Sequence, residues 1–116
     1  MPLYIESRYT GGQKIQVAEN DFPDEMNWKD AMSACAGLGN GWRLPTREEL
    51  MAMYEQLYKQ GKGNFKDTWY WSRSKGFSDF AWGVNFSNGF VSSDYLSLNG
   101  FGKSDYYQVR AVRAKP

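Results

Sequence analysis

The chain changes its hydrophobic periodicity at the glycine-rich segment 61–64. Before this segment, two stretches place apolar residues at intervals of three and four, which is the spacing of one face of an α-helix. After it, this spacing does not return, and short runs rich in aromatic residues and valine follow, as is typical of β-strands. The sequence therefore predicts an α+β domain.

The first predicted helix covers residues 28–38. Asn27 is the expected N-cap, with Asp30 three positions later, and the apolar residues of the helix recur on one face. Cys35 lies on this face, so we interpret it as a small core residue and not as a reactive thiol.

The second predicted helix covers residues 47–60 and has the strongest local signal in the chain. Thr46 and Glu49 form the capping-box pattern, in which each side chain accepts a hydrogen bond from the backbone N–H of the other residue. Gly61 then ends the apolar stripe. We interpret Arg43, just upstream, as a structural residue that satisfies backbone carbonyls or a carboxylate such as Glu49.

The predicted strands are short and lie on both sides of the helices. The segment Ser87-Asn-Gly89 separates two of them and predicts a hairpin turn. The last strand is apolar at Val109, Ala111 and Val112, which breaks strict alternation, so we expect it to be buried on both faces. The predicted strands cover residues 3–5, 14–17, 68–72, 80–86, 90–92 and 107–114.

Five other prominent side chains are interpreted as structural. Trp42, Trp71 and Trp82 each lie beside apolar residues in or next to a predicted element, which favours the core over a ligand site. Arg110 and Arg113 are interpreted as anchors at a strand edge or between loops.

The chain contains no histidine and a single cysteine. These absences exclude His-dependent catalytic triads, zinc sites built from histidine or several cysteines, and an intrachain disulfide. Glu48 and Glu49 lie at a predicted helix start, where interaction with the helix dipole explains them without a catalytic carboxylate pair. We therefore expect neither an enzyme activity nor a cofactor.

The formal net charge is +1, from 14 basic and 13 acidic residues, and neither sign is concentrated in one segment. Neither a nucleic-acid partner nor membrane insertion is therefore expected. The first residues lack a basic segment followed by an apolar one, which indicates a cytoplasmic or particle-borne chain. An export signal upstream of Met1 would instead make it extracellular. The sequence leaves the oligomeric state open.

Five short motifs follow one another along the chain. They read WKDAMSAC at 28–35, LGNGWRLPTREEL at 38–50, YWS at 70–72, AW with VNFSNG within 81–89, and VRAVR at 109–113. In this order they resemble the bacterial Lcl C-terminal-type domain, a family named after the C-terminal domain of a collagen-like surface adhesin. The resemblance covers about residues 26–114 of a chain that we expect to form one domain over 1–116.

The resemblance implies a C-type-lectin-like fold, with two helices flanking small antiparallel sheets, termini close together and a long irregular loop region that displays a ligand-binding surface. Calcium-dependent lectin relatives use a Glu-Pro-Asn or Gln-Pro-Asp loop followed by Trp-Asn-Asp, and neither pattern occurs here. The acids Asp79, Asp94 and Asp105 are spread along separate segments, whereas calcium needs six or more oxygen ligands. No metal site is therefore expected.

Residues 85–107 consist almost entirely of Ser, Asn, Gly, Asp and aromatic residues. Tyrosine gives a large contact area with few rotatable bonds, while Ser, Gly and Asn form adaptable hydrogen bonds, as in antibody binding loops. The alternative is that Phe86, Phe90, Leu96 and Leu98 pack inward and that the polar residues form ordinary turns.

Our hypothesis is a non-catalytic recognition or adhesion module that binds a protein or a glycan through the loops at residues 72–79 and 94–107. The alternative hypothesis is a structural accessory domain of a larger envelope or phage-particle assembly, without a dedicated ligand pocket. The candidate ligand-binding residues are Arg73, Asp94, Tyr95, Asn99, Phe101, Lys103, Asp105 and Tyr106.

Overall fold

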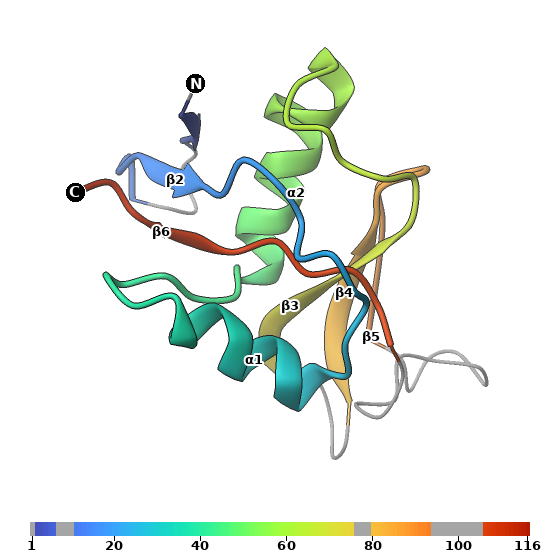
Figure 1. Cartoon of the computed structure of the whole chain (residues 1–116). Coiled ribbons are helices and arrows are strands. Elements are labelled where there is room, and N and C mark those ends of the chain that lie inside the picture. The colour runs from blue at the N-terminus through green and yellow to red at the C-terminus, as the bar shows by residue number, and fades with distance from the viewer. Residues whose placement is uncertain (1, 7–10, 76–79, 94–105) are drawn as a thin grey trace.

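Figure 1 shows a computed structural model of the chain, which describes residues 2–6, 11–75, 80–93 and 106–116. The fold is α+β, as predicted, with two α-helices and two small antiparallel sheets. The helices are α1 (Trp28–Gly37) and α2 (Arg47–Gln56), and a short 3-10 helix, η2 (Tyr58–Gln60), follows α2. The strands are β1 (Leu3–Ile5), β2 (Ile15–Val17), β3 (Trp69–Lys75), β4 (Ala81–Asn85), β5 (Phe90–Ser93) and β6 (Val112–Ala114).

The first sheet joins the early and the late parts of the chain. Its strand order is β1-β2-β6, and both pairings are antiparallel. Ile15 and Val17 of β2 point into the core, while Gln16 between them is only partly buried. Because β6 pairs with β2, the two labelled ends of the chain lie on the same side of the molecule (Figure 1).

The second sheet has the order β3-β4-β5 and contains the predicted hairpin. The Ser87–Gly89 turn joins β4 to β5, so this prediction is confirmed. The predicted end of the third strand, at residue 72, was wrong, because β3 continues to Lys75. Lys75 pairs with Ala81 after a register shift, and the Arg73 N–H donates to the Pro45 carbonyl at 2.7 Å.

Both predicted helices are present, with small changes at their ends. The Asn27 side chain accepts a hydrogen bond from the Asp30 N–H, which confirms the N-cap of α1. The complete Thr46 and Glu49 capping box begins α2. The α-helix ends at Gln56 and not at residue 60, because the last turn tightens into η2. Gly61, at φ +72°, then ends it in the left-handed conformation.

The predicted strand at 107–114 is regular only in β6. Before β6, the chain pairs with different partners in turn: Tyr107 with Met26, and Gln108 in parallel with Tyr70. Because its partners belong to different elements, this segment does not form one continuous β-ladder. All residues from 108 to 112 are nevertheless buried. The prediction of a segment buried on both faces is therefore confirmed.

Two hydrophobic clusters form the core, and β3 contributes to both. Tyr70 belongs to the cluster beneath α2, where its ring centroid lies 4.6 Å from that of Phe86. The next residue, Trp71, belongs to the cluster that contains Cys35 of α1. Successive strand residues point to opposite faces, so a single strand closes two cores.

The other interpretations of aromatic residues are confirmed only in part. Trp71 is fully buried, but Trp42 and Trp82 are partly exposed. Under the alternative in which Phe86 and Phe90 pack inward, Phe86 fits because it is fully buried, but Phe90 does not, because 60% of it is exposed on the edge strand β5. Leu96 and Leu98 lie outside the described residues.

Arg110 is fully buried and connects three distant segments. Its Nε donates to Asp21 Oδ1 at 2.7 Å, Nη1 to the Ala18 carbonyl at 2.9 Å, and Nη2 to the Gly63 carbonyl at 2.8 Å. The guanidinium also lies 4.0 Å from the ring centroid of Phe65. Arg110 is thus an anchor between loops, and its burial is compensated by a carboxylate and by carbonyls.

Tyr70 completes this buried network. Its hydroxyl donates to Asp21 Oδ2 at 2.7 Å and accepts a hydrogen bond from the Lys66 N–H at 2.9 Å. Burial raises the pKa of Tyr70 well above its usual value, so the hydroxyl keeps its proton and remains a donor near neutral pH.

Replacing Arg110 by methionine is expected to lower the free energy of unfolding by about 3 to 5 kcal/mol, because Asp21 and two carbonyls would lose a buried partner. Urea denaturation of the purified domain measures this loss. Arg113→Met is the control: this partly exposed arginine contacts Gln16 and the Asn40 carbonyl, and its loss is expected to have an effect of about 1 kcal/mol or less. Equal effects for the two variants would contradict the assignment.

Burial raises the pKa of the Cys35 thiol to about 12. The thiolate is the reactive form, so native Cys35 is expected to resist a thiol reagent such as DTNB at pH 8 and to react only when the domain unfolds. The labelling rate in increasing urea should follow the unfolded fraction. Rapid labelling of the native protein would contradict this placement.

Candidate functional site

The described residues on both sides of segment 76–79, and the residue before segment 94–105, lie at one end of the second sheet. Lys75 at the end of β3 pairs with Ala81 at the start of β4, and Ser93 at the end of β5 pairs with Trp82. The chain therefore leaves the sheet after Lys75 and after Ser93 at this end, and it re-enters the sheet here at Ala81. We call the described side chains here the loop-end surface, which consists of Arg47, Arg73, Ser74, Lys75 and Trp82.

The start of α2 fixes the backbone of the loop-end surface. The Arg47 N–H, one of the donors that a helix start leaves without an intrahelical partner, donates to Ser74 Oγ at 3.0 Å. One residue earlier on β3, the Arg73 N–H donates to the Pro45 carbonyl. These two contacts hold β3 beyond its predicted end and place the Arg73 side chain in solvent.

The Arg47 side chain covers Trp82. Its guanidinium carbon lies 4.5 Å from the Trp82 ring centroid, within the range of a cation–π contact. Its Nε lies 2.6 Å from Glu48 Oε2, in a partly exposed ion pair. In the described part of the chain, no carboxylate pairs with Arg73 or Lys75, so these two exposed cations remain available to a ligand.

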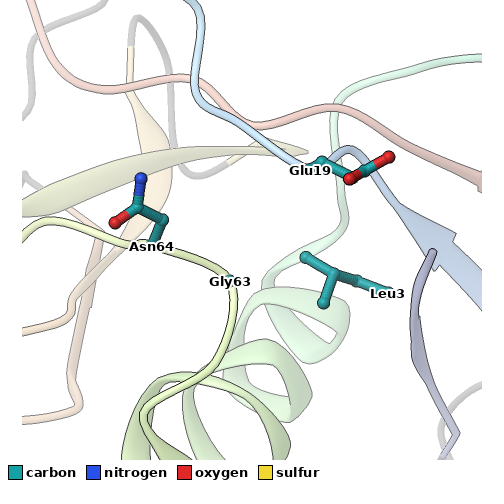
Figure 2. Close-up of a pocket in the computed structure, with 4 residues that line it drawn as sticks. All are labelled: Leu3, Glu19, Gly63 and Asn64. Carbon is teal, nitrogen blue, oxygen red and sulfur yellow. The ribbon is translucent and has the colours of Figure 1, made fainter. Parts of the chain in front are cut away.

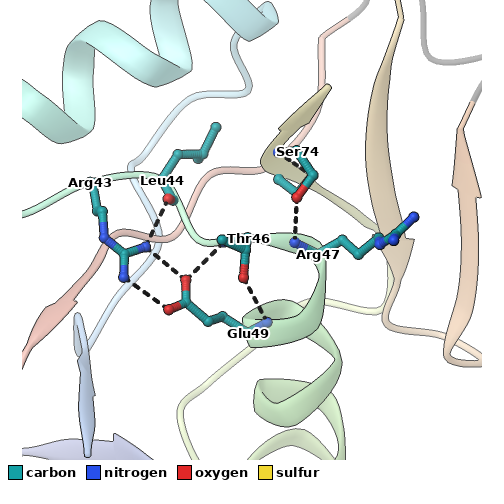
Figure 3. A network of polar contacts seen from close by, with 7 residues as sticks. Arg43, Leu44, Thr46, Arg47, Glu49 and Ser74 are labelled. Carbon is teal, nitrogen blue, oxygen red and sulfur yellow. Dashed lines mark hydrogen bonds and ion pairs between the residues drawn. The ribbon is translucent and has the colours of Figure 1, made fainter. Parts of the chain in front are cut away.

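A network of charged and polar groups stabilises the start of α2 (Figure 3). Arg43 forms two hydrogen bonds to Glu49: Nη1 donates to Oε1 at 2.7 Å, and Nη2 donates to Oε2 at 2.9 Å. Glu49 Oε1 also accepts the Thr46 N–H at 2.8 Å, and Thr46 Oγ1 accepts the Glu49 N–H at 3.1 Å. The structural interpretation of Arg43 is thus confirmed.

The network also sets the charge state of Glu49. Burial by itself would raise the pKa of this carboxyl, but the hydrogen bonds from Arg43 and Thr46 and the Arg43 charge outweigh it, so the pKa lies below its ordinary value. The hydrogen bond to Glu49 raises the pKa of Arg43 against the opposing effect of burial. Both residues therefore carry their charges at neutral pH.

Two of the predicted ligand-binding residues are described, and both are exposed. Arg73 belongs to the loop-end surface, and 61% of Tyr106 is exposed next to the bridge between Tyr107 and Met26. Because Gln108 pairs with Tyr70 in parallel, Tyr106 lies towards the start of β3 and Arg73 towards its end. The predicted residues Asp94, Tyr95, Asn99, Phe101, Lys103 and Asp105 lie outside the described residues.

The contribution of Arg47 was missed from the sequence. Its position immediately after the N-cap suggested only a helix start, and its contact with Trp82 joins residues 35 positions apart. A signal was nevertheless present, because Trp82 shares its strand face with Val84 and Phe86, which pack beneath α2. A cation in the first turn of that helix was therefore a candidate neighbour.

Two concavities are formed by described residues away from the loop-end surface. The first, of about 200 Å³, lies between Leu3, Glu19, Gly63 and Asn64 (Figure 2). Glu19 is its only ionisable lining residue, and the Gly63 and Asn64 carbonyls face Arg110. The second, of about 500 Å³, is lined by Gln13, Lys14, Ala114 and Lys115.

The loop-end surface presents two exposed cations, Arg73 and Lys75, together with the partly buried Ser74 and Trp82. No group of three or more His, Cys, Asp or Glu residues that could hold a metal ion occurs within the described ranges. Glu48 and Glu49, in the first turn of α2, are each paired with an arginine. Arg73 can form two parallel hydrogen bonds to an acceptor of a ligand. Among the described helices, none has the length and apolar character needed to cross a membrane.

The described residues form a small α+β domain with two capped helices and two three-stranded sheets. The family model described as the Lcl C-terminal domain matches residues 12–113, and the chain belongs to this family. The match confirms the resemblance seen in the five motifs and extends it towards the N-terminus to include β2. No curated protein matches the chain.

Glu49→Gln is expected to lower the free energy of unfolding at pH 7 by about 1 to 3 kcal/mol, because the partly buried Arg43 charge would lose its carboxylate. Since the folded-state pKa of Glu49 is lowered, its contribution is present above the unfolded-state pKa and is lost as the pH falls through the folded-state pKa. Denaturant unfolding of both proteins between pH 2 and pH 7 should therefore show curves that converge in acid. A difference that is constant with pH would contradict this role.

Proposed function

We propose that the chain is a non-catalytic recognition or adhesion module with a C-type-lectin-like fold, associated with a bacterial surface. It binds a protein or a glycan through the loop-end surface together with residues 94–107. Arg73 and Tyr106 are its described contact residues, and Asp94, Tyr95, Asn99, Phe101, Lys103 and Asp105 complete the proposed set.

The proposal rests mainly on Arg73, an exposed cation whose backbone is held in place by the segment just before α2. The Arg73 N–H donates to the Pro45 carbonyl just before α2, and Ser74 Oγ accepts the Arg47 N–H, while the Arg73 side chain extends into solvent. A binding group whose backbone is already held in place loses less conformational freedom on complex formation, which favours affinity. The adjoining segment supplies tyrosine, serine, glycine and asparagine, a composition suited to recognition.

Family and fold support the same conclusion. Membership of the Lcl C-terminal domain family agrees with a role at a bacterial surface, since the family is named after part of a surface adhesin. Two helices beside small antiparallel sheets, with the first and last strands in one sheet, fit a C-type-lectin-like layout. Fold alone does not assign function, so the proposal depends on the exposed residues.

An array of glycans and purified surface proteins tests the proposal, followed by titration of each binder against variants. Arg73→Ala with Tyr106→Ala is expected to weaken binding roughly 10- to 100-fold, as loss of two contact residues with arginine and tyrosine chemistry does. Because both side chains are exposed, the melting temperature should change little.

Lys62→Ala, which removes another exposed cation, is the matched control and should bind as the unmodified domain does. If no ligand on the array binds reproducibly, or if the double variant binds as tightly as the control, the chain is better explained as a structural accessory domain.

A further inference from the structure

A second group of exposed side chains lies at the end of the second sheet that is remote from the loop-end surface. Trp69 of β3 pairs with Asn85 of β4, and Asn85 pairs with Phe90 of β5. Residues directly opposite one another in a sheet project from the same face. Trp69, Asn85 and Phe90 therefore form a row across all three strands, which we call the cross-strand row.

The two aromatic rings of the cross-strand row form a corner. Their centroids are 6.2 Å apart and their planes meet at 81°, an edge-to-face arrangement. Trp69 is partly buried against the core cluster that contains Trp71, whereas 60% of Phe90 is exposed. An exposed phenylalanine beside a partly exposed tryptophan leaves apolar surface open to solvent, which is a feature of binding surfaces.

Asn85 occupies the middle strand of the cross-strand row and adds a hydrogen-bond donor to it. Its Oδ1 accepts from both the Ser87 N–H, at 2.9 Å, and Ser87 Oγ, at 2.8 Å. This fixes which side of the amide faces the turn, so the Nδ2 donors point away from it. Within the described part of the chain, no group accepts a hydrogen bond from Nδ2.

The turn that carries the row is rigid. Asn88 Oδ1 accepts the Phe90 N–H at 2.8 Å and so holds the start of β5. Gly89 has φ +77°, and a Cβ at this position would lie only 2.7 Å from Cε2 of Tyr54 on α2. The turn is thus packed directly against the helix, and the row is formed before any ligand arrives.

We propose that Trp69, Asn85 and Phe90 form a subsite for a neutral pyranose ring. One face of such a sugar presents C–H groups that pack on aromatic rings, while its hydroxyls accept hydrogen bonds from a donor such as Asn85 Nδ2. All three side chains are uncharged, which favours a neutral sugar over a charged one. The subsite is separate from the loop-end surface and does not depend on the proposed function there.

The test is calorimetric titration of the full chain with three neutral oligosaccharides: cellohexaose, chitohexaose and β-1,4-galactohexaose. At least one is expected to bind. Phe90→Ala removes the exposed ring, and Asn85→Asp keeps the acceptor for Ser87 while removing the Nδ2 donor. Each variant is expected to weaken binding at least about tenfold.

Two matched controls are Phe90→Tyr, which keeps the ring, and Leu38→Ala, which removes another exposed apolar side chain at the end of α1. Both should bind as the unmodified chain does, and melting temperatures identify any variant that is not folded. The subsite is overturned if none of the three sugars binds, or if Phe90→Ala and Asn85→Asp retain full affinity.

Two further outcomes would also overturn the subsite. One is sugar binding that is lost in Arg73→Ala but not in Phe90→Ala, which would support the loop-end surface instead. The other is binding of hexaproline, in place of a sugar, through Phe90.

Discussion

One buried guanidinium, that of Arg110, determines how the loops of this domain meet the core. A charge withdrawn fully from water is tolerated only where a carboxylate and carbonyls surround it. Here these acceptors are Asp21, Ala18 and Gly63, which lie far from Arg110 in sequence. The segment before α1, the loop after η2 and the C-terminal segment must therefore assemble together for any of them to be stable.

The C-terminal segment, which contains Arg110, forms backbone hydrogen bonds with both sheets. Val112 exchanges two backbone hydrogen bonds with Arg43, each of 2.8 Å, and β6 continues onto β2. Further back, the Trp71 N–H of β3 donates to the Gln108 carbonyl. Arg43 in turn holds Glu49, whose capping box starts the helix that fixes the loop-end surface. A continuous set of contacts thus leads from the buried arginine to the proposed binding residues.

The sequence predicted the features that arise from neighbouring residues. The cap at Asn27, the capping box of Thr46 and the turn at Ser87–Gly89 each join groups a few positions apart, so local patterns are sufficient. The extension of β3 was missed because its acceptor, the Pro45 carbonyl, is remote in sequence. Likewise, the sequence pattern placed Phe90 in a strand, but it could not show that Phe90 is exposed, because exposure depends on which elements cover the sheet. Of the predicted ligand residues, only Arg73 and Tyr106 fall within the described chain, both exposed.

The C-terminal segment joins the two sheets into one cooperative unit beneath the loop-end surface. Native-state hydrogen exchange in low denaturant measures it through three amides that bond to this segment: Ala18 to Ala111, Arg43 to Val112, and Trp71 to Gln108. All three are expected to open with the free energy of global unfolding. If the Trp71 amide opened at a distinctly lower free energy than those of Ala18 and Arg43, the second sheet would unfold separately, and the claim would be contradicted.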